Sequence, residues 1–392
     1  MSTVKVGAIR GVSASSDAIT VANDGSCTAN ITNNLSNRNL VINGAMEVAQ
    51  RATSSTGNGY QSLDRFAVYV TNVGTTVTKS QQDLSSSDTP YSLGFRKFHR
   101  TALSGAGTAA ADSEVIVLQN IEAQNIATSG WNYTSTSSYV TVQFWFRCST
   151  NQTFYFYLET KDGTPQSYPI SFTASGNNTW TKITQTFPGN SNVQIDNDNG
   201  EGLLLVAVPF YGTNRTDDSK SLNQWSAFTD AARTPDYAST WLTAGASTFD
   251  ITGVQLEVGE VATDFEHRSF GQELQLCKRY YQKSYPYSVA PGTASSPAAM
   301  IISRYSDEVT NRPDLATRWE VEMRATPTLT TYRPFSGGAT QVENFGSGIG
   351  TVAGNGRSYT VQNLGATGFG GFTLISATSN TIGYHYQVDA EL

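Results

Sequence analysis

Charged side chains are scarce in this sequence of 392 residues. Asp, Glu, Lys and Arg together make up 15% of it, against about 25% in an average soluble protein. The net charge is −7 and the basic residues form no run, which disfavours binding to the phosphates of a nucleic acid. Apolar runs of membrane-spanning length are absent as well, so we expect no membrane insertion.

A secretion signal is also missing from the start of the sequence. The first residues, Met1–Val6, lack the apolar stretch that a signal peptide requires. We therefore expect synthesis in the cytoplasm, and a route other than signal-directed export if the protein acts outside the cell.

Cysteine and histidine are rare, with three of each. Because Cys27, Cys148 and Cys277 are far apart and form no CxxC pair, we expect buried free thiols, without a disulfide framework or a zinc site. His99, His267 and His385 belong to no HExxH motif, and no GxSxG nucleophile motif occurs. These absences favour a protein that is not an enzyme.

Aromatic and small residues, in contrast, are abundant: 11% of the chain is Phe, Trp or Tyr, and 34 residues are Gly. Alternating residues over short segments predict strands at 66–70, 115–118, 140–147 and 154–159. At 140–147 and 154–159 one side of the strand is apolar, and the other carries polar and aromatic side chains. Residues 203–208 form a continuous apolar run, typical of a strand buried on both faces. Since no helical blocks separate these segments, we predict an all-β fold, a β-sandwich or jelly roll.

The most informative stretch is 249–281. Val254, Leu256 and Val258 alternate with polar residues and predict a strand. Ser269 and Gln272 then have the spacing of a capping box, so a helix begins there. The sequence thus predicts a β-domain that ends in a short connecting helix, whose apolar stripe consists of Leu274, Cys277 and Tyr281.

Two segments resemble a known group of proteins. TGVQLEVGEVATDFEHRSFGQELQLCKRYYQK (252–283) and NLVINGAMEVAQR (39–51), the latter followed by Asp64-Arg65-Phe66, are similar to segments of tail-fibre and minor structural proteins of bacteriophages, notably phages of marine bacteria. In that family the first segment ends a carbohydrate-binding-like jelly roll. The resemblance implies a phage tail fibre or receptor-binding protein that recognises a host-surface polysaccharide. It also implies a place in the tail of the virion, with release by lysis.

On this basis we expect four regions: an arm at 1–38 that docks on a tail adaptor or nozzle protein, a jelly-roll sandwich at 39–268, a connecting helix at 269–285, and a small C-terminal β-domain at 286–392 that forms the tip. In the last region, alternation predicts strands at 318–324 and 382–388. The resemblance further implies a homotrimer, with Leu274, Cys277 and Tyr281 as the oligomer contact. Packing of this stripe on the chain's own sandwich is the alternative.

Acidic residues raise two further possibilities. The run from Asp196 to Glu201 resembles part of a calcium loop, although its glycine comes one residue too early for an EF-hand. A structural calcium ion at Asp196 and Asp198 is one interpretation and a plain turn is the other, and we expect no other cofactor. A polysaccharide depolymerase would need a pair of carboxylates, which no spacing singles out. A depolymerase and a non-binding structural virion protein, such as a decoration or spacer protein, are the alternatives to receptor binding.

The strands predicted at 140–147 and 154–159 place aromatic and polar side chains away from the core. Because residues 149–153 suffice for a hairpin, we expect these outward faces to lie side by side and to bind glycan through Trp145, Tyr155 and Tyr157 together with Gln143, Arg147 and Glu159. Cover by another protomer or by the arm is the alternative. Further candidate platforms are Trp225, Tyr237 and Trp241, and then Tyr332 and Tyr384.

Overall fold

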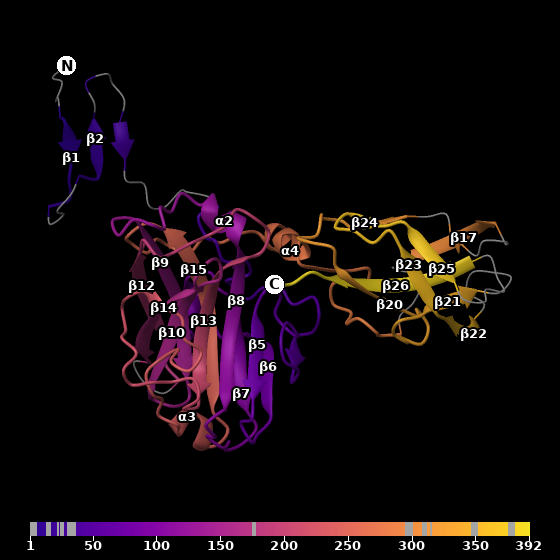
Figure 1. Cartoon of the computed structure of the whole chain (residues 1–392), viewed down its shortest axis with the longest axis horizontal. Coiled ribbons are helices and arrows are strands. Elements are labelled where there is room, and N and C mark those ends of the chain that lie inside the picture. Colours follow the sequence, from indigo (N-terminus) through magenta and orange to yellow (C-terminus); the bar gives the residue numbers. More distant parts are fainter. Residues whose placement is uncertain are drawn as a thin grey trace.

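The computed structural model describes residues 6–12, 17–21, 23, 27–29, 37–174, 178–294, 301–307, 312–313, 316–345, 352–374 and 381–392. Nearly all regular structure within these residues is β, so the predicted all-β fold is confirmed. Figure 1 shows a larger sandwich joined through helix α4 (Phe270–Lys278) to a smaller β-unit.

The larger unit consists of two antiparallel six-stranded sheets. Sheet 1 has the strand order β12-β9-β15-β7-β6-β4, and sheet 2 has the order β14-β11-β10-β13-β8-β5. The strands are β4 (Ser54–Ser55), β5 (Ala67–Thr71), β6 (Val77–Asp83), β7 (Lys97–Leu103), β8 (Glu114–Glu122), β9 (Tyr139–Cys148), β10 (Thr153–Thr160), β11 (Gln166–Thr173), β12 (Thr181–Pro188), β13 (Glu201–Tyr211), β14 (Ser226–Ala227) and β15 (Thr248–Val258).

The apolar faces of the two sheets meet in one core. Phe144 and Phe146 of β9 are fully buried, and so is Phe154 of β10. The ring centroids of Phe144 and Phe156 lie 5.5 Å apart, and those of Phe146 and Phe154 lie 5.3 Å apart. The inward faces predicted for β9 and β10 are therefore confirmed, and so is the burial of residues 203–208 on both faces of β13.

The hairpin expected between β9 and β10 is wrong. β9 pairs with β12 and β15 in sheet 1, whereas β10 pairs with β11 and β13 in sheet 2. Residues 149–152 instead carry the chain across the edge of the sandwich. The prediction failed because a link of this length can either close a hairpin or cross between sheets. The outward faces of the two strands consequently lie on opposite sides of the molecule.

Helix α4 begins as predicted, but it ends at Lys278, so the connecting helix predicted at 269–285 is too long and Tyr281 lies in strand β16 (Tyr281–Lys283). The Ser269 hydroxyl accepts a hydrogen bond from the Gln272 backbone N–H, and the Gln272 side chain accepts one from the Ser269 backbone N–H. The other helices in the described part of the chain have only four or five residues, namely α1 (Thr89–Ser92), α2 (Ala123–Ala127) and α3 (Thr240–Thr243). No helix that the structure describes is long and apolar enough to cross a membrane.

The smaller β-unit is built around β26 (Thr381–Asp389), which confirms the strand predicted at 382–388. β26 pairs with β16 (Tyr281–Lys283), β17 (Ile301–Asp307), β20 (Thr328–Tyr332) and β21 (Val342–Phe345). The remaining strands are β18 (Arg312–Pro313), β19 (Thr317–Arg318), β22 (Val352–Arg357), β23 (Tyr359–Gln362), β24 (Gly368–Phe369) and β25 (Gly371–Leu374).

The strand predicted at 318–324 is wrong beyond Arg318. Trp319 and Met323 are buried in the core of the smaller β-unit, as their alternation predicted. Their backbone N–H groups, however, donate to the carbonyls of Thr367 and Ala366 in a neighbouring loop instead of forming a strand ladder. Alternation therefore reported burial correctly but not backbone conformation.

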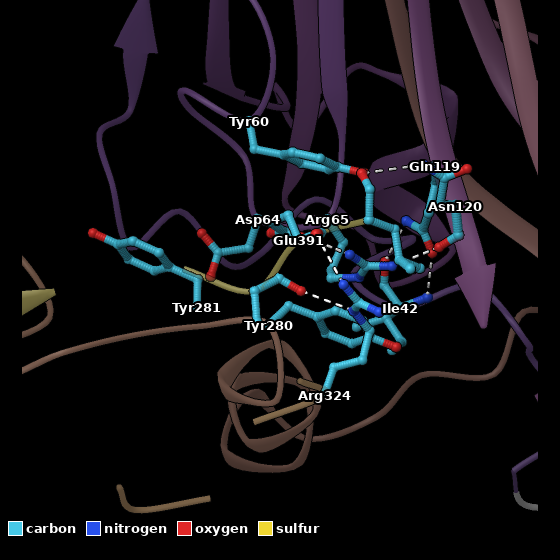
Figure 2. Close-up of polar contacts among 12 residues, drawn as sticks. Ile42, Tyr60, Asp64, Arg65, Gln119, Asn120, Tyr280, Tyr281, Arg324 and Glu391 are labelled. Carbon is cyan, nitrogen blue, oxygen red and sulfur yellow. Dashed lines mark hydrogen bonds and ion pairs between the residues drawn. The ribbon is translucent and has the colours of Figure 1, made fainter. Parts of the chain in front are cut away.

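Ion pairs join the two β-units, and the pair of Arg65 with Glu391 is buried (Figure 2). The Arg65 guanidinium is 1% exposed, pairs with Glu391 and lies 3.4 Å over the ring of Tyr280. Arg51 contacts Asp389 at 2.8 Å and lies 3.8 Å over the ring of Tyr281. The chain after β26 is thereby fixed against the first sandwich.

The stripe of Leu274, Cys277 and Tyr281 packs on the chain itself. Cys277 is fully buried and Tyr281 is 1% exposed, so two of the three residues predicted as an oligomer contact are covered within one chain, while Leu274 is half-buried. Burial raises the pKa of the Cys277 thiol. Cys148 and Cys277 are both buried and free, as predicted.

The described parts of the arm at 1–38 contain three short strands, β1 (Ala8–Ile9), β2 (Ile19–Val21) and β3 (Cys27–Ala29), which form an antiparallel sheet. Every described side chain in β1 is exposed, as are most in β2. Figure 1 shows this sheet apart from the sandwich. A sheet so small buries little apolar surface, as expected from the composition of the arm.

Candidate functional site

A pocket of about 250 Å³ lies on the outer face of sheet 1. Its floor consists of the middle of β9 with the adjacent parts of β12 and β15, and its walls are the segments 93–95 and 264–267. The lining residues are Leu93, Phe95, Gln143, Phe144, Trp145, Lys182, Gly253, Asp264, Phe265 and His267. Two of them, Gln143 and Trp145, belong to the predicted glycan-binding set.

Strand pairing places Trp145 in the middle of the floor. It lies directly opposite Lys182 on β12 and opposite Thr252 on β15. Side chains opposite each other on antiparallel strands are about 5 Å apart at their β-carbons, so Lys182 flanks the Trp145 ring. The outward direction predicted for Trp145 is therefore correct.

A bulge in β15 brings the pocket walls close to Trp145. The register shifts between Thr252 and Gln255, and Gly253 has a φ of 64°. A β-carbon on Gly253 would lie 2.8 Å from the ring of Phe95 and 3.2 Å from that of Trp145. Glycine at this position thus allows both rings to approach the strand.

The walls are held in place by contacts within the chain. The ring centroids of Phe95 and Phe265 lie 4.8 Å apart, and the His267 ring packs on them at 4.9 and 5.0 Å respectively. His267 Nε2 lies 2.8 Å from the carbonyl oxygen of Leu93 and donates a hydrogen bond to it. The Gln143 side-chain amide donates to the Thr263 carbonyl at 2.6 Å. The pocket is therefore formed before any ligand binds.

A cluster of charges beside the pocket is closed to ligands. Asp250 is fully buried and accepts two hydrogen bonds of 2.8 Å from Arg100, and Arg147 contacts it at 2.9 Å. Arg147 also contacts Asp88 at 3.0 Å and lies 4.5 Å over the ring of Trp180. The hydrogen bond from Arg100 to Asp250 raises the pKa of Arg100. Arg147, predicted to bind glycan, is instead held by protein groups.

Trp145 differs from the other five tryptophans, all of which the structure describes. The indole N–H groups of Trp131, Trp180, Trp225, Trp241 and Trp319 each donate a hydrogen bond to a carbonyl or carboxylate of the chain. Among the described residues, no group accepts a hydrogen bond from the Trp145 indole. Its ring is half-buried and its N–H remains available beside the pocket.

The predicted aromatic residues of β10 are not accessible. Tyr155 is 8% exposed and Tyr157 is 1% exposed, and Glu159 is buried as well. The Tyr157 hydroxyl lies 2.9 Å from that of Tyr211, and the ring of Tyr155 packs against Tyr237 with 4.9 Å between centroids. Burial raises the pKa of both Tyr155 and Tyr157. The chain's own segment after β13 covers this face, and the predicted joint surface with Trp145 is wrong.

The other candidate platforms are also dispersed or buried. Trp241 is fully buried in the sandwich core and Trp225 donates to the Pro188 carbonyl at 2.6 Å. Tyr237 packs on the outer face of sheet 2, and Tyr384 is fully buried in the core of the smaller β-unit. Tyr332 is half-buried, with its ring centroid 6.0 Å from that of Tyr285.

Metal ligands do not gather in the described residues. No group of three or more His, Cys, Asp or Glu side chains there could hold an ion. The carboxylates of Asp198 and Asp162 accept hydrogen bonds from the backbone N–H groups of Gly200 and Asp196, as in a turn. His99 lies in the sandwich interior, where burial lowers its pKa to about 3. Calcium at Asp196 and Asp198 remains a prediction.

Sequence reasoning missed most of the pocket. Phe95, Phe265 and His267 come from loops, so no strand alternation marks them, and Lys182 lies on a strand whose outward residues are polar. The one usable signal was Gly253 inside the strand 249–258, because an isolated glycine in a strand indicates a bulge or a close approach.

No protein-family model and no curated protein matches this chain. Among solved structures, it is similar to the enzymatically active domain of tailspike protein 4 of bacteriophage CBA120 (TM-score 0.29, 12% identity, 56% of this chain and 21% of that one). It is also similar to the N-terminal cellulose-binding domain of a Cellulomonas fimi β-1,4-glucanase (0.27, 12%, 55% and 100%). A third is the family 11 carbohydrate-binding module of a Clostridium thermocellum cellulosomal cellulase (0.27, 12%, 55% and 98%). Because all three TM-scores are below 0.5, we base nothing about ligand or activity on them.

Proposed function

We propose that this protein binds a host-surface polysaccharide through the pocket at Trp145, as a phage tail-fibre or receptor-binding protein. The observation that carries this proposal is the state of Trp145, whose indole N–H has no partner among the described residues while the other five tryptophans all have one. An aromatic ring with an available hydrogen-bond donor, beside a preformed pocket, suits the binding of a sugar ring.

The chemistry of the lining supports a sugar. Pyranose rings stack their C–H faces on aromatic side chains, and their hydroxyls need fixed polar groups around that ring. Trp145 provides the flat surface and Phe265 an apolar wall, and the buried Phe95 ring packs against Phe265. The exposed polar residues in the lining are Lys182, Asp264 and His267, whereas Gln143 is buried and bonded to the Thr263 carbonyl.

Isothermal titration calorimetry of the purified chain against alginate, polygalacturonate, xylan, mannan and dextran tests this proposal. We expect Trp145→Ala to lower the affinity for the bound polysaccharide by at least about 10-fold, since buried tryptophans dominate many binding sites. Tyr69→Ala is the matched control, because Tyr69 is an aromatic residue on the outer face of sheet 2 and is 39% exposed. Equal affinities of the wild type and Trp145→Ala, with both folded, would refute the site.

The resemblance of 39–51 and 252–283 to tail-fibre proteins supports the part of the proposal that concerns the place of the protein in the virion. The arm at 1–38 docks on a tail adaptor or nozzle protein, and three chains associate. Deleting 1–38 should leave polysaccharide binding intact but abolish incorporation into the phage that carries the gene. A monomer at micromolar concentration in sedimentation equilibrium would refute the trimer.

A depolymerase is the weaker alternative at this pocket. Glycoside hydrolysis generally uses two carboxylates that flank the scissile bond, and Asp264 is the single acid in the lining. We therefore expect no release of reducing ends from the polysaccharide that binds. A purely structural virion protein is the remaining alternative, and it would bind none of the polysaccharides tested.

A further inference from the structure

Lys182 stands out among the lysines of the chain. Of the seven that the structure describes, six donate to a carboxylate, a carbonyl or a hydroxyl of the protein. These are Lys79, Lys97, Lys161, Lys220, Lys278 and Lys283. Lys182 has no such partner among the described residues. A cation left unpaired in a chain that pairs its other described lysines is available to an external anion.

The position of Lys182 decides where that anion would lie. Lys182 is opposite Trp145 on the neighbouring strand and lines the same pocket. A sugar ring stacked on Trp145 therefore has the ammonium group at its edge, where ring substituents project. An ammonium group forms stronger hydrogen bonds with an anionic oxygen than with a hydroxyl.

Asp264 provides the complementary group on another side of the pocket. It belongs to the segment 260–268, which is bonded to β9 through Gln143 and to β15 through Gln255. β15 and β12 flank β9 on opposite sides, so this segment and Lys182 approach Trp145 from different strands. The Asp264 carboxylate forms no ion pair with any residue that the structure describes, and it can accept hydrogen bonds from sugar hydroxyls.

We propose that the pocket selects an acidic sugar, that is, a single sugar unit bearing an anionic group that Lys182 pairs with while the ring stacks on Trp145. This inference rests on the proposed function. The volume of about 250 Å³ is below the roughly 300–1,000 Å³ typical of small-molecule sites, so the pocket holds one sugar unit of a chain or its end.

Two matched pairs of polysaccharides test the charge directly. Polygalacturonate is compared with its carboxyl-reduced form, and dextran sulfate with dextran, so that each pair differs in the anionic group alone and the two pairs separate carboxylate from sulfate. We expect the wild type to bind one acidic member at least about 10-fold more tightly than its neutral counterpart.

Three variants then locate the charge. Lys182→Met, which keeps the apolar stem, should remove the preference, and Lys182→Arg should retain it. Lys161→Met is the control, because Lys161 pairs with Glu159 on the other sheet and should leave the preference unchanged. Raising the salt from 0.05 to 0.5 M should weaken binding of the acidic polymer by the wild type more than by Lys182→Met.

The outcomes separate this inference from the proposed function. Equal binding of the acidic and neutral members, or a preference that survives Lys182→Met, overturns the acidic-sugar inference while the sugar site at Trp145 stands. No binding of these polymers, or of the panel used for Trp145, by the folded wild type overturns both.

Discussion

The two outer faces of the larger sandwich use aromatic residues in opposite ways. On sheet 2, Tyr155 and Tyr157 point away from the core, yet Tyr155 packs against Tyr237 from the segment after β13 and Tyr157 is bonded to Tyr211 of β13, so both are buried. On sheet 1, Trp145 points outward in the same manner, but its neighbours leave a pocket open above it. Both faces carry outward aromatic side chains, but the pocket beside Trp145 lies on sheet 1, and on sheet 2 the rings of Tyr155 and Tyr157 are covered while Tyr69 is exposed.

Hydrogen bonding is what distinguishes the two faces. The Tyr157 hydroxyl is bonded to that of Tyr211, which in turn accepts a hydrogen bond from Arg233 at 3.0 Å. On sheet 1 the polar groups around Asp250 are equally satisfied, whereas Trp145, Lys182 and Asp264 keep unpaired groups within the described structure. A buried polar group without a partner costs free energy, so the covered tyrosine hydroxyls are bonded within the chain, whereas groups on an open face can be satisfied by solvent or a ligand.

The largest effect should come from the closed part of the face of sheet 1. Asp250→Ala would leave Arg100 and Arg147 without their buried carboxylate, and breaking such a cluster costs about 3–5 kcal/mol of unfolding free energy. Urea denaturation measures this loss. Asp83→Ala is the control, because the Asp83 carboxylate is 79% exposed in its pair with Lys97 and should cost less than about 1 kcal/mol. Equal losses in the two variants would contradict the distinction between the closed and open parts of this face.

Gly253→Ala should damage the pocket more than the fold. The added methyl group would push the Phe95 ring away from the strand and into the pocket, and the φ of 64° would become strained at about 1–2 kcal/mol. We expect about a 10-fold loss of polysaccharide affinity. Gly130→Ala is the matched control: it has a φ of 89° and open space around its β-carbon, so it should cost similar stability without loss of affinity. Unchanged affinity of Gly253→Ala would exclude Phe95 from the site.

The sequence predicted strands, their inward faces and the capped helix, because these depend on local periodicity and on the spacing of Ser269 and Gln272. It did not predict which sheet each strand joins, since a link such as 149–152 serves a hairpin and a crossover equally well. It also did not predict which outward side chains are covered by other segments of the chain. Alternation shows that Tyr157 and Trp145 point away from the core, but whether a distant loop lies over them depends on packing between segments far apart in the sequence.

Tyr157→Phe tests the covered face by removing one buried hydroxyl. The Tyr211 hydroxyl would retain its bond from Arg233, so we expect a loss of about 1 kcal/mol in unfolding free energy. Polysaccharide affinity should not change, because Tyr157 lies on the opposite side of the sandwich from Trp145. A fall in affinity at unchanged stability would show that the covered face binds ligand after all.

Tyr155→Phe should have the smallest effect and separates the two faces most sharply. The Tyr155 hydroxyl lies 3.4 Å from the carbonyl oxygen of Asp236, which is long for an O–H···O hydrogen bond, and its loss should cost about 0.5 kcal/mol or less. The ring would keep its contact with Tyr237. Combined with Trp145→Ala, it should add nothing to the loss of affinity caused by Trp145→Ala alone, because residues on opposite faces share no ligand and distant substitutions act additively. Calorimetric titration of the two single variants and the double variant provides the measurement. A further loss in the double variant would mean that both faces contribute to one binding surface. Within a single chain the crossing at 149–152 excludes such a surface, because it places the two faces on opposite sides of the sandwich. A joint surface would then require a second copy of the chain.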